Sequence, residues 1–277
     1  MRERIRVSSI GYLNTVPLTW SLLRQRPPNL EFSFTVPSQC ADDVARGRAE
    51  VGIIPSIEYQ RIPGLSVLAG PAIASRERVR SIVLLTSRPL EEVETVAADA
   101  SSRTSLALAE LVLRCRYGCR PQLLLRAPDP PMMLKECDAA VIIGDPALHY
   151  SLDPLPGIQS FDLVTEWRAW TGLPFVFAFW AARQDMATPE LAQAFAEARD
   201  RGVAAIPEIV PGEARRRGLP EPLVAEYLSR NIWYYLDEPC LAGLERFYQL
   251  AAEHGLISRV IPLKLVQPTA VTTGARA

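Results

Sequence analysis

The 277-residue chain contains only two histidines, His149 and His254. Histidine is the side chain whose ordinary pKa lies closest to neutral pH, and it is also the commonest metal ligand in proteins. Two histidines offer little basis for catalysis by a histidine base and are too few for a metal site built from several histidines. The sequence also has no P-loop, no G-x-G-x-x-G, no G-x-S-x-G and no H-E-x-x-H motif. The familiar signatures of nucleotide-binding, serine-hydrolase and zinc-protease chemistry are all missing.

Long apolar runs and an excess of either charge are missing too. The most apolar segment, Leu173 to Ala182, is far shorter than a bilayer crossing requires. The beginning, "MRERIRVSSIGYLN", is charged and then strand-like, unlike a signal peptide, so we expect a cytoplasmic protein with no membrane partner. With 30 basic and 31 acidic residues the formal net charge is -1. This balance argues against a nucleic-acid partner, because proteins that bind nucleic acids normally carry an excess of basic residues.

The five cysteines are an odd number and lack the spacing of a metal site. Cys115 and Cys119 would share a helix face only if the helix continued past Gly118, and no histidine cluster accompanies them. We interpret all five as reduced thiols, as is usual in the cytoplasm, and expect no metal centre.

Strand and helix signals alternate along most of the chain. The segments "AEVGIIPS" and "RSIVLLTS" are nearly continuous apolar strands, as expected for parallel sheets that are covered on both faces. Further strands are indicated by "VETVAAD", "PQLLLRAP" and "DAAVIIGD", and the sequence from Thr188 onward has mostly helical periodicity. These patterns predict an α/β fold with mostly parallel sheets and a helical C-terminal part.

The middle of the chain, roughly Pro89 to Phe177, has the pattern of a self-contained unit with a strand at each edge. Two chain crossings would then join two lobes, with residues 1–88 and 178–277 in the first and residues 89–177 in the second. A ligand would lie in the central cleft, lined by the loops that follow the carboxyl ends of strands.

The stretch "DASSRTSLAL" places several hydroxyl groups at the predicted start of a helix. The candidate ligand-binding residues there are Ser102, Arg103, Thr104 and Ser105. Free backbone N–H groups and the positive end of the helix dipole favour an anion at such a place, here a carboxylate or a phosphate. The structural alternative is plain helix capping by a serine.

Other strand ends supply further candidates for the cleft. Ser56 begins a short predicted helix after an apolar strand, so a second anion contact would lie on the opposite lobe and suit a molecule with two carboxylates. The remaining candidates at predicted strand ends or crossings are Ser81, Gly144, Asp145, Thr171 and Gly172. For Ser56 and Asp145, helix capping is the alternative interpretation.

The turn "GYLNTVP" places the uncharged Asn14, followed by Thr15, between a predicted strand and a predicted helix. Asn14 either caps the helix or faces a ligand, and Thr15 is a further candidate for contact with the ligand.

Several segments, in order along the chain, resemble one enzyme family. They are "YLNTVPL", "GIIPSIEY", "RSIVLLTS", "DASSRTSLAL", "AAVIIGDPAL", "FDLVTEWRAWTGLPFVFAFW" and "GLERFYQLAAEHGLI". Together they are similar to chorismate dehydratase, the first enzyme of the futalosine route to menaquinone. The resemblance implies the two-lobed type II fold of periplasmic binding proteins, in the cytoplasm. It also implies conversion of the small dicarboxylate chorismate to 3-[(1-carboxyvinyl)oxy]benzoate and water, without metal or organic cofactor.

By this resemblance Asn14 is the motif asparagine of the active site. A neutral carboxamide is a poor general base, so we expect Asn14 to orient the substrate while the enolpyruvyl carboxylate of the substrate takes the proton. Ser81 and the segment from Ser102 to Ser105 would hold carboxylates, with Ser56 as a further contact.

Two other readings stay open. The related 1,4-dihydroxy-6-naphthoate synthase shares the fold, but it has a catalytic histidine in an "HE" pair where this chain has Gly144 and Asp145, and it lacks the "YLNT" turn. A non-catalytic small-anion-binding protein would instead predict export or a lipid anchor. The sequence leaves the oligomeric state undetermined.

Overall fold

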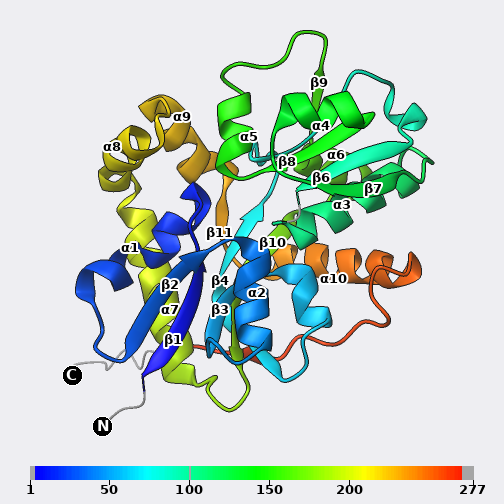
Figure 1. The fold of residues 1–277 in the computed structure, drawn as a ribbon. Coiled ribbons are helices and arrows are strands. Elements are labelled where there is room, and N and C mark those ends of the chain that lie inside the picture. The colour runs from blue at the N-terminus through cyan, green and yellow to red at the C-terminus, as the bar shows by residue number, and fades with distance from the viewer. Residues whose placement is uncertain (1–3, 100, 270–277) are drawn as a thin grey trace.

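The structure, a computed structural model, describes residues 4–99 and 101–269. These residues form two β-sheets that lie one above the other in Figure 1, each with helices on both faces. The first sheet has seven strands in the order β11-β4-β10-β3-β1-β2, with β12 beside β4. Its strands are β1 (Ile5–Ile10), β2 (Leu30–Thr35), β3 (Val51–Pro55), β4 (Leu65–Ser75), β10 (Phe175–Arg183), β11 (Trp233–Tyr235) and β12 (Leu265–Val266).

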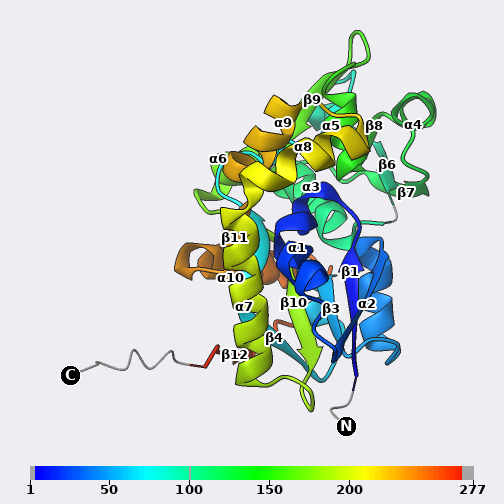
Figure 2. The same ribbon diagram turned by 90° about the vertical axis from the view of Figure 1, so that its left-hand side faces the viewer.

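Helices α1 (Val16–Gln25) and α7 (Pro189–Ala204) cover one face of the first sheet, and α2 (Pro37–Ala45) covers the other (Figure 2). The other helical segments of this lobe are η1 (Leu13–Thr15), η2 (Ser56–Gln60), α8 (Ile206–Arg217), α9 (Glu221–Glu226), the π-helical turn η4 (Tyr227–Asn231) and α10 (Glu238–Glu253). The helical C-terminal part predicted from Thr188 onward is thus confirmed.

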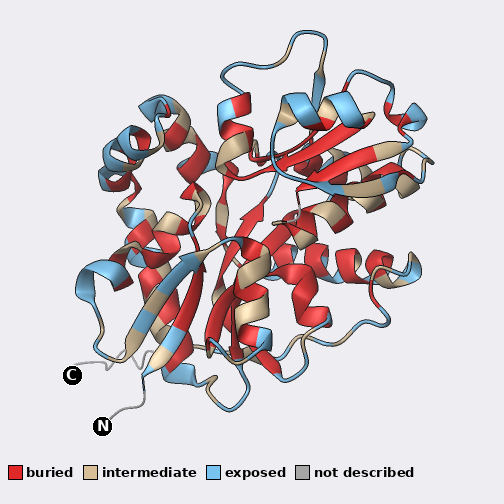
Figure 3. Ribbon diagram, viewed as in Figure 1, coloured by how far each residue is buried: buried red, intermediate tan, exposed pale blue. Residues whose placement is uncertain are grey.

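The second sheet has five strands in the order β7-β6-β8-β5-β9. Its strands are β5 (Ile82–Thr86), β6 (Thr95–Asp99), β7 (Gln122–Arg126), β8 (Ala139–Ile143) and β9 (Gln159–Asp162). Its helical segments are η3 (Leu90–Glu92), α3 (Arg103–Cys115), α4 (Pro130–Glu136), α5 (Asp145–Tyr150) and α6 (Leu163–Thr171). The central strands are buried throughout (Figure 3), which explains their continuous apolar sequences.

Side-chain alternation along β5 separates two layers of the core. Val83 and Leu85 pack with Met133 of α4 and Tyr150 of α5. Leu84, between them in sequence, points to the other face and joins the large core that α3 and α6 share with the first lobe. The helices therefore sandwich this sheet.

The sheets are mixed rather than mostly parallel. Half of the strand pairings among the described residues are antiparallel. Both β5 and β10, the strands that follow a crossing between the sheets, run antiparallel to two neighbours. A buried apolar strand has the same composition in either orientation, so the sequence pattern did not reveal this.

The two crossings also differ from the predicted positions. Strand β5 pairs with β8 and β9 of the second sheet, so the first crossing lies between Ser75 and Ile82 instead of after residue 88. The second lies between Thr171 and Phe175, because all of β10 pairs with the first sheet, instead of after residue 177. Apolar periodicity identifies a strand but does not say which sheet it joins.

No helix in the described ranges combines the length and the apolar character that a bilayer crossing needs.

Candidate active site

A narrow hollow lies between the two sheets and has about 430 Å³ of empty space, its open mouth included. Its walls come from segments that follow the carboxyl ends of β1, β2 and β3 in the first lobe and of β6 and β8 in the second, with parts of β4, β5 and β10. The polar side chains in its walls belong to Tyr12, Asn14, Ser102, Thr104 and Ser105. None of the described lining residues is charged. This is the place where open α/β sheets bind ligands.

A wider groove borders the hollow on the outer side of the first lobe, with about 1110 Å³ of empty space. It shares Ile10 and Tyr12 with the hollow, and its other walls include Trp20, Leu23 and Phe34. All its described lining residues belong to the first lobe and its helices. The hollow is the stronger candidate because both lobes contribute polar groups to it.

Asn14 lies half-buried in η1, the short helix between β1 and α1. The hydroxyl of Thr15 donates a hydrogen bond to Asn14 Oδ1 at 3.2 Å. Thr15 is buried and does not line the hollow, so its predicted direct contact with the substrate is replaced by a contact with Asn14.

Tyr227, which the sequence analysis did not identify, lies behind Asn14. Its hydroxyl donates to Ser81 Oγ at 2.8 Å. Complete burial raises the pKa of Tyr227 far above its usual value, and the nearby Ser81 and Asn14 oppose this only in part, so the phenol stays neutral. Ser81 is fully buried and lies outside the lining of the hollow.

Tyr227 begins the π-helical turn η4, a local irregularity that is frequent at functional sites. In the sequence this tyrosine lies within an ordinary helical pattern, and the turn has no sequence signature that would have pointed to it.

Ser102 immediately precedes α3 at the N-cap position, and its side chain makes no capping hydrogen bond within the described residues. Ser102, Thr104 and Ser105 all line the hollow. The Thr104 hydroxyl accepts a hydrogen bond from the N–H of Ile57 at 3.2 Å, which ties the start of α3 to the first lobe. The capping explanation for Ser102 therefore does not describe this geometry. The start of α3 borders the hollow.

Arg103 points away from the hollow. Its guanidinium pairs with Glu58 at 2.7 Å and with Asp42 at 2.9 Å, both in the first lobe. Side chains one residue apart project about 100° apart around a helix, so four consecutive residues do not all face one cavity. The predicted substrate contact at Arg103 is thus replaced by an ion pair between the lobes.

Ser56 is fully buried outside the hollow. Its hydroxyl donates to the carbonyl oxygen of Val176 at 2.8 Å, and its own carbonyl oxygen accepts from the Tyr248 hydroxyl at 2.6 Å. These contacts fasten the start of η2 to β10 and to α10. Ser56 is placed to hold the fold rather than a ligand.

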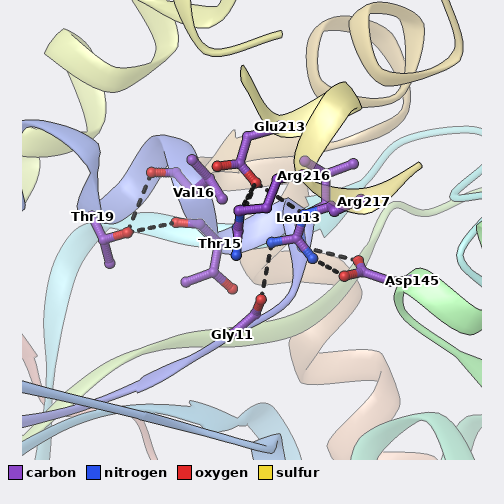
Figure 4. Close-up of polar contacts among 9 residues, drawn as sticks. All are labelled: Gly11, Leu13, Thr15, Val16, Thr19, Asp145, Glu213, Arg216 and Arg217. Carbon is purple, nitrogen blue, oxygen red and sulfur yellow. Dashed lines mark hydrogen bonds and ion pairs between the residues drawn. The ribbon is translucent and has the colours of Figure 1, made fainter. Parts of the chain in front are cut away.

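Gly144 lines the hollow, whereas Asp145 does not. The backbone of Gly144 has φ +66°, and a Cβ atom there would lie 2.9 Å from the ring of Tyr12, so glycine is required on both counts. The carboxylate of Asp145 accepts from the N–H of Leu13 at 3.0 Å and pairs with Arg217, as Figure 4 shows. The predicted substrate contact at Asp145 is therefore a contact within the protein.

Thr171 and Gly172 terminate α6 and do not line the hollow. The Thr171 hydroxyl donates to the carbonyl oxygen of Trp167 at 2.9 Å and accepts from the N–H of Leu173 at 3.2 Å. Gly172 has φ +74°, the usual conformation of a residue that ends a helix. Their place beside the predicted second crossing suggested the cleft, but in the structure these residues complete a helix end.

The described residues contain no group of three or more histidine, cysteine, aspartate or glutamate side chains that could hold a metal ion. Of the predicted site residues, the hollow brings together Asn14, Ser102, Thr104, Ser105 and Gly144.

Two sheets joined by two crossings, with a narrow hollow between them, define a two-lobed fold like that of periplasmic binding proteins. Solved structures agree. A protein of Archaeoglobus fulgidus matches with a TM-score of 0.73 and 19% identity, covering 92% of this chain and 98% of its own. The aliphatic sulphonate binding protein of Escherichia coli matches with a TM-score of 0.68 and 18% identity, covering 97% and 94%.

The chain belongs to the menaquinone biosynthesis family, whose model matches residues 5–253. It is 31% identical over 252 residues to a chorismate dehydratase of Thermus thermophilus, a match that covers 85% of this chain and 91% of the relative. It is also 31% identical over 246 residues to a chorismate dehydratase of Campylobacter jejuni, covering 86% and 93%.

Proposed function

We propose that the protein dehydrates chorismate to 3-[(1-carboxyvinyl)oxy]benzoate and water, as a step of menaquinone biosynthesis. The observation that carries this proposal is the hollow itself, where Asn14 of the "YLNT" turn faces the hydroxyl-rich start of α3. The likeness to two chorismate dehydratases over most of the chain supports the same reaction.

The reaction does not require the protein to supply a strong acid or a strong base. Loss of the C3 proton and the C4 hydroxyl group turns the cyclohexadiene ring into a benzene ring, which is strongly favourable. The C3 proton is acidified by the ring diene, which is conjugated to the ring carboxylate. The protein must mainly hold the two carboxylates and align the breaking bonds, and such orientation contributes on the order of 7–11 kcal/mol in favourable cases.

The start of α3 is the site that we assign to a substrate carboxylate. Backbone N–H groups and the positive end of the helix dipole stabilise an anion there without a charged side chain. Ser102 and Ser105 line the same space, and their hydroxyls would supply further donors.

Asn14 is the residue that we assign to orienting the reacting part of the substrate. No described lining residue of the hollow carries a carboxylate, an amine or an imidazole, so a protein base is not at hand there. The enolpyruvyl carboxylate of chorismate would then accept the C3 proton and pass it to the departing C4 hydroxyl, which leaves as water, while hydrogen bonds from the hollow assist its departure. The family resemblance further supports the futalosine route, a cytoplasmic location and a reaction without cofactor.

The test is to incubate purified protein with chorismate, without added cofactor and with EDTA, and to follow formation of the aromatic product. We expect 3-[(1-carboxyvinyl)oxy]benzoate in amounts equal to the chorismate consumed. Turnover of cyclic dehypoxanthinylfutalosine in place of chorismate would instead identify a naphthoate synthase. Chorismate binding without any product would identify an anion-binding protein.

A further inference from the structure

Arg217, the last residue of α8, makes three polar contacts with its guanidinium although only 8% of its side chain is exposed (Figure 4). Nη2 donates to the carbonyl oxygen of Gly11 at 3.0 Å, and Nε donates to Glu213 at 2.9 Å. Nη1 pairs with the carboxylate of Asp145. Arg217 therefore joins the first lobe, through Gly11, to the second lobe, through Asp145.

Asp145 makes the complementary contact. It begins α5 in the second lobe, and its Oδ1 accepts the N–H of Leu13 at 3.0 Å while Oδ2 faces Arg217. The carbonyl of Gly11 and the N–H of Leu13 are thus both fixed, one by each member of the ion pair. These peptide groups lie in the turn that carries Asn14.

Neither Arg217 nor Asp145 lines the hollow, so neither has access to a ligand there. Hydrogen bonds to charged groups are stronger than those between neutral groups, particularly where burial weakens competition from water. The pair also spans the two lobes, so opening of the cleft at this side would break it. The contacts of this ion pair hold the turn that precedes Asn14. They can form only when α5 and α8 lie close together.

We propose that Arg217 and Asp145 are positioning residues that lock the peptide from Gly11 to Leu13, and with it Asn14, when the lobes close. The effect on catalysis rests on the proposed function. The effect on the turn does not, because it is visible in the exchange of the Leu13 amide hydrogen without any substrate.

The experiment compares wild type with R217M, R217K, D145N, D145A and the control R216M. Arg216 is the neighbouring arginine, with 58% of its side chain exposed, and among the described residues it forms an ion pair only with Glu213. Hydrogen exchange is measured by mass spectrometry on peptides covering residues 11–16 in ligand-free protein, and circular dichroism confirms folding. Chorismate turnover supplies kcat and KM.

We expect R217M and D145A to exchange the Leu13 amide about tenfold faster or more. A small displacement of an orienting residue is enough to lower kcat about 10²-fold, so a loss of that order is expected with KM changed by less than about threefold. R217K and D145N should lie between these variants and wild type, because a cation or the Oδ1 acceptor remains. R216M should match wild type in both measurements.

Unchanged exchange at Leu13 in R217M and D145A would overturn the proposal, and so would exchange accelerated equally by R216M. Faster exchange with a kcat within about twofold of wild type would show that the lock does not serve catalysis. Should R217M fail to fold, D145N removes only the charge of the partner residue. Its Leu13 exchange and its kcat can then be compared with those of wild type in the same way. If wild type does not convert chorismate, the proposed function fails while the exchange measurement still decides whether the lock exists.

Discussion

The hydroxyl of Thr15 donates a hydrogen bond to Oδ1 of Asn14, the residue just before it in the chain, at 3.2 Å. The hydroxyl of Tyr227 lies near the same carboxamide and donates to Ser81. The side chain that we assign to orienting the substrate is therefore held by Thr15 and lies close to a second polar neighbour, Tyr227. Such support is what a residue that acts through geometry requires.

Replacing Thr15 by valine keeps the shape of the side chain and removes the hydrogen bond to Asn14. One neutral hydrogen bond is worth about 1 kcal/mol, so we expect kcat to fall by about fivefold with little change in KM. Steady-state kinetics on chorismate measure both. Thr15→Ser retains the hydroxyl and should retain most of the rate, whereas full activity in Thr15→Val would show that the Thr15 contact is unimportant.

Ser102→Ala distinguishes a ligand contact from a helix cap. Because Ser102 makes no capping bond, we expect the melting temperature to stay within about 1 °C of wild type, whereas loss of a true cap costs about 1 kcal/mol. A hydrogen bond to a carboxylate is worth about 1.5–3 kcal/mol, so KM should rise about tenfold or more. A lower melting temperature with an unchanged KM would support capping instead.

Gly202 allows α7 to pack closely against the start of α1. A Cβ atom there would lie 1.7 Å from the carbonyl oxygen of Pro17, so Gly202→Ala must push the helices apart. We expect a loss of at least about 1–3 kcal/mol in the free energy of unfolding. The matched control is Gly212→Ala in α8, where a Cβ atom meets nothing within 4 Å and helix propensity should add about 0.5–1 kcal/mol.

Urea unfolding of both glycine variants measures this difference. Equal stability of the two variants would contradict the close approach of α7 to α1. Because α1 follows directly after η1, we also expect Gly202→Ala to lose more chorismate turnover than Gly212→Ala.

Stability at high pH should depend on three buried phenols. Burial raises the pKa of Tyr227, Tyr234 and Tyr248 above the ordinary value. In the unfolded chain they ionise near pH 10, so above about pH 10 the folded state holds protons that the unfolded state has lost. The free energy of unfolding must then fall as pH rises.

Tyr227→Phe removes one of these groups. It should lower stability by a constant amount below pH 10, from the lost bond to Ser81, and make the decline above pH 10 shallower by up to about 1.4 kcal/mol per pH unit. Urea unfolding at several pH values from 8 to about 11 tests this. Parallel curves for variant and wild type would show that Tyr227 ionises normally in the folded protein.

The sequence was sufficient to predict the two-lobed α/β fold, because buried strands and capped helices have strong local patterns. It also located the facing groups of the hollow, Asn14 and the start of α3, since each follows the carboxyl end of a strand. Strand orientation and the crossing points depended on pairing between distant segments, which periodicity does not encode.

The candidate residues that lie outside the hollow share a feature. Ser56, Arg103, Asp145 and Thr171 have suitable residue types at strand or helix ends, but each is engaged by a partner far from it in the sequence or by its own helix end. Tyr227 and Arg217 come from the helical C-terminal part, and only the folded chain brings them beside the "YLNT" turn.

The most direct test of the account is turnover of chorismate by Asn14→Ala and Asn14→Asp beside wild type, with binding of chorismate measured by calorimetry. We expect Asn14→Ala to bind chorismate and to lose about 10²-fold or more in kcat, because the orienting carboxamide is gone. Activity in Asn14→Asp with none in Asn14→Ala would extend the role of this position to a carboxylate. Full turnover by a folded Asn14→Ala would contradict the central claim.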